Sequence, residues 1–204
     1  MKDCGGCGFT TCVEFYKKLK ENPVLSKNCI YLQRGEEEAK EGIIENNKTV
    51  WRDSLGREFD FILEYFPEEP GPREIIIPHN PLLTREMELK AGETIIGRPL
   101  GISCGCPVTH CGIIMEVDKK TGVVVWCVTG PLTPRQNGFK DLGYYTALGY
   151  EGLIQESRCE IKIGMRYFFL PRRCMLQWRH SGLVNYLNHT ASGLQARLEG
   201  LWIG

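Results

Sequence analysis

The sequence predicts an α+β protein in which a small N-terminal helical module precedes a β-rich, barrel or sandwich-like domain with a C-terminal helix. Three observations favour this class. Four cysteines and a short helical pattern occupy the first thirty residues, the middle of the chain alternates apolar and polar residues at strand period, and leucines recur in the tail at helical spacing. We therefore expect two domains, residues 1–42 and residues 43–204.

The N-terminal cysteines follow the spacing C-x2-C-x4-C-x16-C, and glycines lie between the first three. Glycine lets a backbone bend around a bulky inorganic core, and cysteine thiolates hold iron–sulfur clusters, so this spacing suits a cluster site. Residues 9–21 are expected to form a helix with Cys12 in its first turn. There, free N–H groups and the positive end of the helix dipole would face an anionic cluster.

The run Asp3-Cys4-Gly-Gly-Cys7-Gly-Phe-Thr-Thr-Cys12, together with Cys29, resembles the small [4Fe-4S] domain of corrinoid iron-sulfur proteins of the acetyl-CoA synthase/CO dehydrogenase system. A similar module occurs in the B subunits of Rnf electron-transport complexes. The resemblance covers residues 3–30 and implies a low-potential [4Fe-4S] cluster ligated by Cys4, Cys7, Cys12 and Cys29. Ile30 departs from the pattern, since many members have proline there. A four-cysteine zinc site is the alternative, although zinc motifs usually pair two close knuckles.

Composition and charge constrain the class of protein. Lys plus Arg and Asp plus Glu both number 25, so no basic excess favours a nucleic-acid partner. The chain contains no run of eighteen apolar residues, and Cys4 follows Met1 too closely for a signal segment. We therefore expect a cytoplasmic protein without a membrane span, in which reducing conditions favour metal ligation by cysteines over disulfides.

The β-rich domain is expected to contain a hairpin over residues 49–65 and further short strands at 74–77, 85–89, 93–98, 112–117, 123–128 and 157–163. The last of these strands would place Cys159 in the core. Loops are expected at 129–138 and in the Gly- and Tyr-rich stretch 142–152, and a helix is expected over the leucine-rich tail.

A second cysteine set, Cys104, Cys106, Cys111 and Cys127, lies in this domain. A turn centred on Lys120 would place Cys127 opposite Ile113 and Cys111 opposite Thr129, so that the two cysteines lie diagonally on one face, within reach of a shared cluster. We expect this set to hold a second iron–sulfur cluster. The alternatives are a zinc site, a redox or nucleophilic thiol in Cys104-Gly-Cys106, and buried cysteines without chemistry.

Three further side chains are candidates whose roles the pattern leaves open. His110 could replace a thiolate, as histidine does in Rieske centres, although a solvent-facing or core position is favoured. Cys174 and His180 lie among several arginines at the start of the tail, a cluster that could meet an anionic cofactor or partner, although simple packing is favoured.

The sequence contains no dinucleotide fingerprint, P-loop, H-E-x-x-H or G-x-S-x-G motif. Our first hypothesis is low-potential electron transfer to a partner enzyme of anaerobic metabolism; the resemblance implies corrinoid or one-carbon chemistry. The second is a redox enzyme whose second cysteine site is an open, substrate-binding metal site. The third is a zinc-stabilised interaction module.

Overall fold

The computed structural model describes residues 12–22, 25, 44–45, 48–101, 106–130 and 132–203. The chain divides into two units, Met1–Val50 and Trp51–Gly204. In the first unit, helix α1 spans Cys12–Glu21, and strand β1 (Ile44–Glu45) pairs antiparallel with β2 (Lys48–Thr49). Glu14 in the first turn of α1 and Lys18 and Lys20 in its last turn complement the helix dipole.

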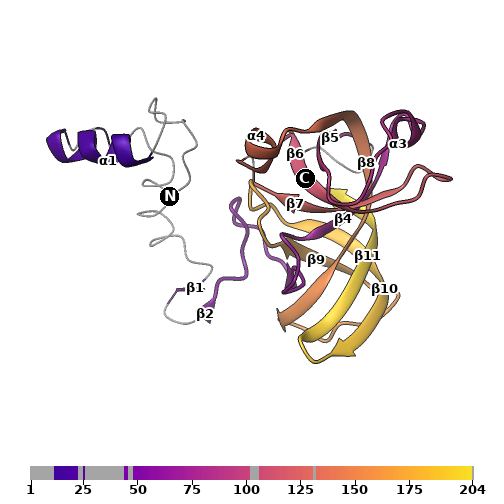
Figure 1. Ribbon diagram of the computed structural model, residues 1–204. Helices are drawn as coiled ribbons and strands as arrows, with labels where there is room; N and C mark the ends of the chain where they lie inside the picture. The colour runs from indigo at the N-terminus through magenta and orange to yellow at the C-terminus, as the bar shows by residue number, and fades with distance from the viewer. Residues whose placement is uncertain are drawn as a thin grey trace. The chain divides into compact units, whose positions relative to one another are not determined.

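The second unit is built on one nine-stranded sheet in the order β11-β10-β9-β3-β8-β4-β7-β6-β5 (Figure 1). Its strands are β3 (Phe61–Glu64), β4 (Arg73–Pro78), β5 (Thr94–Pro99), β6 (His110–Val117), β7 (Val124–Thr129), β8 (Lys140–Ser157), β9 (Arg166–Pro171), β10 (His180–Thr190) and β11 (Gly193–Ile203). Two short helices, α3 (Leu83–Glu86) and α4 (Leu132–Asn137), lie in the connections.

The long strand β8 joins two closed rings of strands. It pairs with β5 and β4, which closes the ring β8-β4-β7-β6-β5, and it also pairs with β3 and β11, which closes the ring β8-β3-β9-β10-β11. Figure 1 shows β5 to β7 in the upper part of this unit and β9 to β11 in the lower part. Closure leaves no free edge within either ring, which protects a sheet from pairing with other chains.

Aromatic residues fill both rings. Phe61 stacks on Phe169 with ring centroids 5.8 Å apart, and Trp126 meets Tyr145 edge to face at 5.5 Å. Where β8 pairs with β3, Gly152 leaves room for the neighbouring backbone, because a side-chain carbon at this position would collide with the carbonyl oxygen of Glu64. The shared strand β8 therefore needs a glycine at this position.

The predicted α+β class is wrong, because the second unit is organised by a sheet and ends in strands. The leucine-rich tail forms the hairpin β10–β11, where we expected a helix. Register shifts between Ser181 and Leu183 and between Val184 and Tyr186 interrupt the alternation of β10. Such bulges add residues to one strand, so the apolar positions lose their period of two and imitate helical spacing.

Other expected elements differ in detail. The strand expected at 85–89 is wrong, since α3 lies there, and the loop expected at 142–152 is the middle of β8. The strand expected at 157–163 is also wrong: β8 ends at Ser157, and Cys159 is exposed and not in the core. The expected 49–65 hairpin forms around its turn, where Arg52 bridges Glu58 and the Phe59 N–H donates to the Trp51 oxygen, but β3 pairs with β8 and β9.

The hairpin around Lys120 is confirmed. Strands β6 and β7 pair with Cys111 opposite Thr129 and Ile113 opposite Cys127, the register expected from the turn Asp118–Gly122. Asp118 stabilises this turn, because its side chain accepts hydrogen bonds from the backbone of Lys120 and from the hydroxyl of Thr121.

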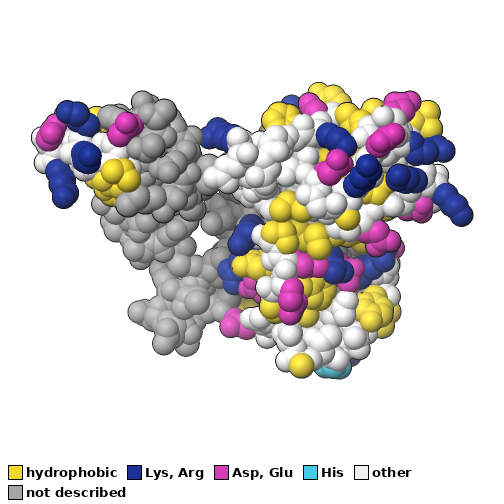
Figure 2. All heavy atoms as spheres, viewed as in Figure 1, with side chains coloured by type: hydrophobic (Ala, Val, Ile, Leu, Met, Phe, Trp, Pro, Cys, Tyr) yellow, Lys and Arg dark blue, Asp and Glu magenta, His cyan; other side chains and the backbone are white. Residues whose placement is uncertain are grey.

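On the face of the second unit seen in Figure 2, basic and acidic side chains are interspersed, with apolar side chains between them. Within the described ranges, no helix has the length and apolar character needed to cross a membrane.

Candidate active site around Cys106 and His110

Glu74 is a fully buried carboxylate inside the first ring of strands. It lies opposite Trp126 of β7 and Tyr150 of β8 in the strand register, so the three side chains share one face of the sheet. Trp126 Nε1 donates to Glu74 Oε2 at 3.0 Å, and the Tyr150 hydroxyl donates to Oε1 at 3.1 Å. The Tyr145 hydroxyl donates a third bond to Oε2 at 3.0 Å.

His110, the first residue of β6, connects this carboxylate to a thiol. Its Nδ1 lies 2.8 Å from the Tyr145 hydroxyl and 3.4 Å from Glu74 Oε2, and its Nε2 lies 3.7 Å from Cys106 Sγ. Because an ionised carboxylate only accepts, the Tyr145 hydroxyl donates its hydrogen bond to Glu74, and its oxygen accepts a hydrogen bond from His110 Nδ1–H. In neutral His110, the lone pair of Nε2 therefore faces the thiol.

The charges of these groups stabilise one another. Burial alone would lower the pKa of His110, but its hydrogen bonds with Cys106 and Glu74 and their negative charges raise that pKa to about 10. Burial would raise the pKa of Cys106, yet the hydrogen bond and charge of His110 and the backbone N–H of Val108 bring it below its usual value. Burial would likewise raise the pKa of Glu74, but His110, Tyr145 and Trp126 lower it. A thiolate–imidazolium pair is thus favoured at neutral pH.

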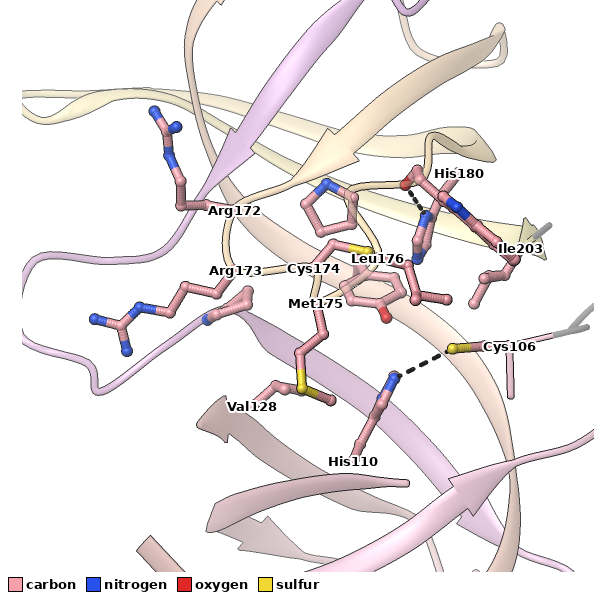
Figure 3. A pocket seen from close by; sticks show the side chains of 14 residues that line it. Cys106, His110, Val128, Arg172, Arg173, Cys174, Met175, Leu176, His180 and Ile203 are labelled. Atoms are coloured by element: carbon pink, nitrogen blue, oxygen red, sulfur yellow. Dashed lines mark hydrogen bonds between the residues drawn. The ribbon is translucent and has the colours of Figure 1, made fainter. Parts of the chain in front are cut away.

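The thiol and the imidazole line a pocket where the two rings of strands meet (Figure 3). His110 and Val128 come from the first ring, Cys106 comes from the segment just before β6, and Tyr150 comes from the shared strand β8. The second ring and the turn between β9 and β10 supply much of the remaining wall, which includes Cys174, Met175, Leu176, Trp178, His180 and Ile203. Apolar walls around a few convergent polar groups are typical of small-molecule sites.

His180 is neutral in this wall. Its Nδ1 lies 2.9 Å from the backbone oxygen of Trp178, and its ring packs edge to face on Tyr150 with centroids 5.5 Å apart. Burial is the main reason that its pKa falls to about 4, and the positive charge of His110 acts in the same direction. The two histidines of the pocket therefore hold different charges at neutral pH.

The described members of the second predicted cysteine set, Cys106, Cys111 and Cys127, do not share one site. Cys106 contacts His110, and the side chains of His110 and Cys111 point to opposite faces because they are consecutive in a strand. Cys111 donates to the backbone oxygen of Thr129 at 3.3 Å, and Cys127 donates to Glu69 at 3.4 Å. Burial raises the pKa of both thiols, that of Cys127 to about 12 with the help of the Glu69 charge.

The remaining predicted ligands lie mostly outside the described residues. This is the case for Cys4, Cys7, Cys29 and Cys104, whereas Cys12 is the first residue of α1. Among the residues that the structure describes, no group of three or more His, Cys, Asp and Glu side chains could hold a metal ion. Both predicted four-cysteine ligand sets therefore stay predictions.

Glu74, Tyr145 and Tyr150 were not identified from the sequence. Glu74 directly precedes the apolar run Ile75-Ile-Ile77, and a carboxylate at the start of such a buried strand signals a special role. The spacing of Cys106 and His110 over one short loop was a second usable signal. The two tyrosines lie in the stretch that we expected to be a loop, so their inward direction on β8 could not be anticipated.

Comparisons with known proteins identify an archaeal relative of this chain. No family model and no solved structure matches the chain. The chain is 31% identical over 212 residues to the uncharacterized protein MJ0119 of Methanocaldococcus jannaschii, and the match covers 98% of this chain and 87% of that protein. The chain therefore belongs to the same family as this archaeal protein.

Proposed function

We propose that the Trp51–Gly204 unit is a thiol-dependent enzyme in which Cys106 is the nucleophile and His110 its proton-transfer partner. The observation that carries this proposal is the continuous chain of contacts from Cys106 through His110 and Tyr145 to the buried carboxylate of Glu74. A nucleophile next to a base that is itself oriented by a third group is the general arrangement of covalent catalysis. Cys106 lines a pocket with a cavity volume of about 30 Å³, which would receive only a small group of a substrate.

Each residue in this series of contacts has a distinct role in the mechanism. Proton transfer from Cys106 Sγ to His110 Nε2 gives the thiolate, which attacks an electrophilic centre of the substrate and forms a covalent bond. The His110 imidazolium then protonates the leaving group. Glu74 and Tyr145 hold the ring with Nδ1 protonated, and the Glu74 charge stabilises the imidazolium.

Alkylation at neutral pH tests this assignment. Iodoacetamide should modify Cys106 faster than the exposed Cys159, which has no histidine contact among the described residues, once each site is quantified by peptide mass spectrometry. His110→Gln should slow the reaction of Cys106 by about tenfold or more, because thiolates and not thiols react. His189→Gln, which changes an exposed histidine on β10, is the matched control.

Two results would contradict the assignment. One is a Cys106 that reacts no faster than Cys159 in the folded protein. The other is a reaction rate at Cys106 that stays the same in His110→Gln while circular dichroism shows an intact fold. Metal analysis of the same preparations distinguishes this role from the open metal site or zinc site that the second cysteine set could also form.

A second function is proposed for the Met1–Val50 unit: a [4Fe-4S] cluster on Cys4, Cys7, Cys12 and Cys29 that exchanges low-potential electrons with a redox partner protein. The cysteine spacing supports it, as does the position of Cys12 as the first residue of α1, because the positive end of a helix dipole favours an anion. A cytoplasmic, reducing compartment suits both a cluster and a reactive thiol.

A further inference from the structure

A second thiol, that of Cys174, lines the same pocket as Cys106. Both cysteines are free, and Figure 3 shows both side chains on the wall of one cavity. Cys106 comes from the segment before β6, and Cys174 comes from the turn between β9 and β10. The negative charge of a Cys106 thiolate acts on Cys174 and opposes its ionisation, so the two thiols are electrostatic neighbours.

The Cys174 thiol lies in a turn with an unusual backbone. Burial raises the pKa of this thiol, and the backbone N–H groups of Trp178, Leu176 and Gln177 act in the opposite direction. Arg173 and Gln177 flank it with φ angles of 66° and 51°, in the left-handed region that residues other than glycine rarely adopt. Strained backbone of this kind concentrates at functional sites, and N–H donors stabilise a sulfur that carries negative charge.

The turn is anchored on both sides of Cys174. Arg172 pairs with Glu64, with Nε 2.8 Å from Oε1, and its backbone N–H donates to the Leu63 oxygen at 2.9 Å. On the other side, the Ser54 hydroxyl donates to the Leu176 oxygen at 2.7 Å. These contacts keep Cys174 at the pocket wall.

We propose that Cys106 and Cys174 are a dithiol pair that reduces disulfide substrates, with Cys106 attacking first and Cys174 resolving the mixed disulfide. This inference rests on the proposed role of Cys106 as the nucleophile. Two thiols that line one pocket, one in contact with a histidine and one held at the pocket wall by an anchored turn, match the two roles that thiol–disulfide exchange requires.

The atoms and electrons of the reaction balance. The Cys106 thiolate attacks one sulfur of R–S–S–R, the S–S bond breaks, and the leaving thiolate takes the His110 proton to give R–SH. Neutral His110 then accepts the Cys174 proton, and Cys174 attacks Cys106 Sγ. The second R–S⁻ leaves and takes the proton back from His110. The substrate gains two electrons, and the protein holds a Cys106–Cys174 disulfide.

The test uses the full-length chain, purified without oxygen and mixed with one equivalent of 4,4′-dithiodipyridine. Wild type should release about two equivalents of thiopyridone per reagent, and peptide mapping should find Cys106 joined to Cys174. Cys174→Ser should release about one equivalent and keep a thiopyridyl group on Cys106. Cys159→Ser changes an exposed cysteine outside the pocket, and it should behave as wild type.

The possible failures are distinguishable. The dithiol inference would be overturned if the thiopyridyl group stayed on Cys106 as long in the wild type as in Cys174→Ser. Cys106 would then remain the nucleophile. Labelling of Cys159 in preference to Cys106 would overturn the proposed function as well. If Cys174→Ser folds poorly, Cys174→Ala gives the same readout. Peptide mapping of the Cys106–Cys174 disulfide in the wild type tests the proposal without either variant.

Discussion

The Tyr145 hydroxyl lies between His110 and Glu74, 2.8 Å from His110 Nδ1 and 3.0 Å from Glu74 Oε2. The direct distance from His110 Nδ1 to that carboxylate oxygen is longer, at 3.4 Å. Tyr145 therefore provides the better hydrogen bond to the imidazole, and Glu74 acts on His110 both through this hydroxyl and through its charge.

Tyr145→Phe should lower the alkylation rate of Cys106 by about tenfold, because losing a hydrogen bond of about 1.4 kcal/mol to the imidazolium weakens the ion pair. The ring of Tyr145 stays in the core beside Trp126, so the fold should persist. Tyr150→Phe is the matched control, since the Tyr150 hydroxyl donates to the other carboxylate oxygen, Glu74 Oε1. Equal rates for these two variants would contradict the role of Tyr145. The measurement is peptide-resolved alkylation at fixed pH.

Protonation of His180 should make the protein less stable in mild acid. The pKa of His180 is about 4 in the folded protein, below the ordinary value of 6.5. Between these values the unfolded chain binds a proton that the folded chain does not, so the free energy of unfolding falls as pH decreases through this window. The expected slope from this residue approaches about 1.4 kcal/mol per pH unit.

Urea unfolding between about pH 5 and pH 7 measures this slope, above the range in which carboxylates begin to titrate. His180→Gln should flatten the dependence even if loss of packing on Tyr150 and Phe169 lowers stability at every pH. His189→Gln, at an exposed position of β10, should keep the wild-type slope. An unchanged slope in His180→Gln would show that the buried ring is not the group that responds.

Local signals predicted part of this fold well. The turn Asp118–Gly122 determined the β6–β7 register correctly, because turn chemistry and strand alternation agree over a short stretch. The closure of two rings through β8 could not be predicted, since it depends on pairings between segments far apart in the chain. The glycines and tyrosines of β8 imitate a loop, although Gly152 is required by the close approach of Glu64.

The same difference between local signals and long-range pairing applies to the site. Cys106 and His110 are close in sequence and were both noted, but the sequence pattern placed Cys106 with Cys111 and Cys127 as a metal site. In the structure, Glu74 and Tyr145, which are distant in the chain, complete the environment of His110 and give the Cys106 thiol a different set of neighbours. Spacing along the chain identifies reactive residue types, whereas the pairing of strands decides which of them meet.

Gly152→Ala should destabilise the second unit by about 3 kcal/mol or more, because the added carbon would collide with the Glu64 oxygen and press on Leu63 in a closed ring that has little room to adjust. Gly130→Ala is the control, since an added carbon there meets nothing within 4 Å. Thermal unfolding by circular dichroism compares the two variants. If the thermal unfolding midpoints of Gly152→Ala and Gly130→Ala were equal, the close approach of β3 to β8 at Gly152 would be contradicted.

Cys12→Ala should remove about four irons per chain and the EPR signal of the dithionite-reduced protein, if the first unit carries a [4Fe-4S] cluster. Its effect should be confined to the cluster, so alkylation of Cys106 should keep its wild-type rate. Cys159→Ala, which changes an exposed cysteine, should retain all the iron. Iron, acid-labile sulfide and zinc are measured on protein purified without oxygen. Full iron content in Cys12→Ala would contradict the N-terminal assignment. A fall from about eight irons to about four would show that the Cys104 to Cys127 set holds a second cluster. That result would contradict the proposal that Cys106 is a free, nucleophilic thiol.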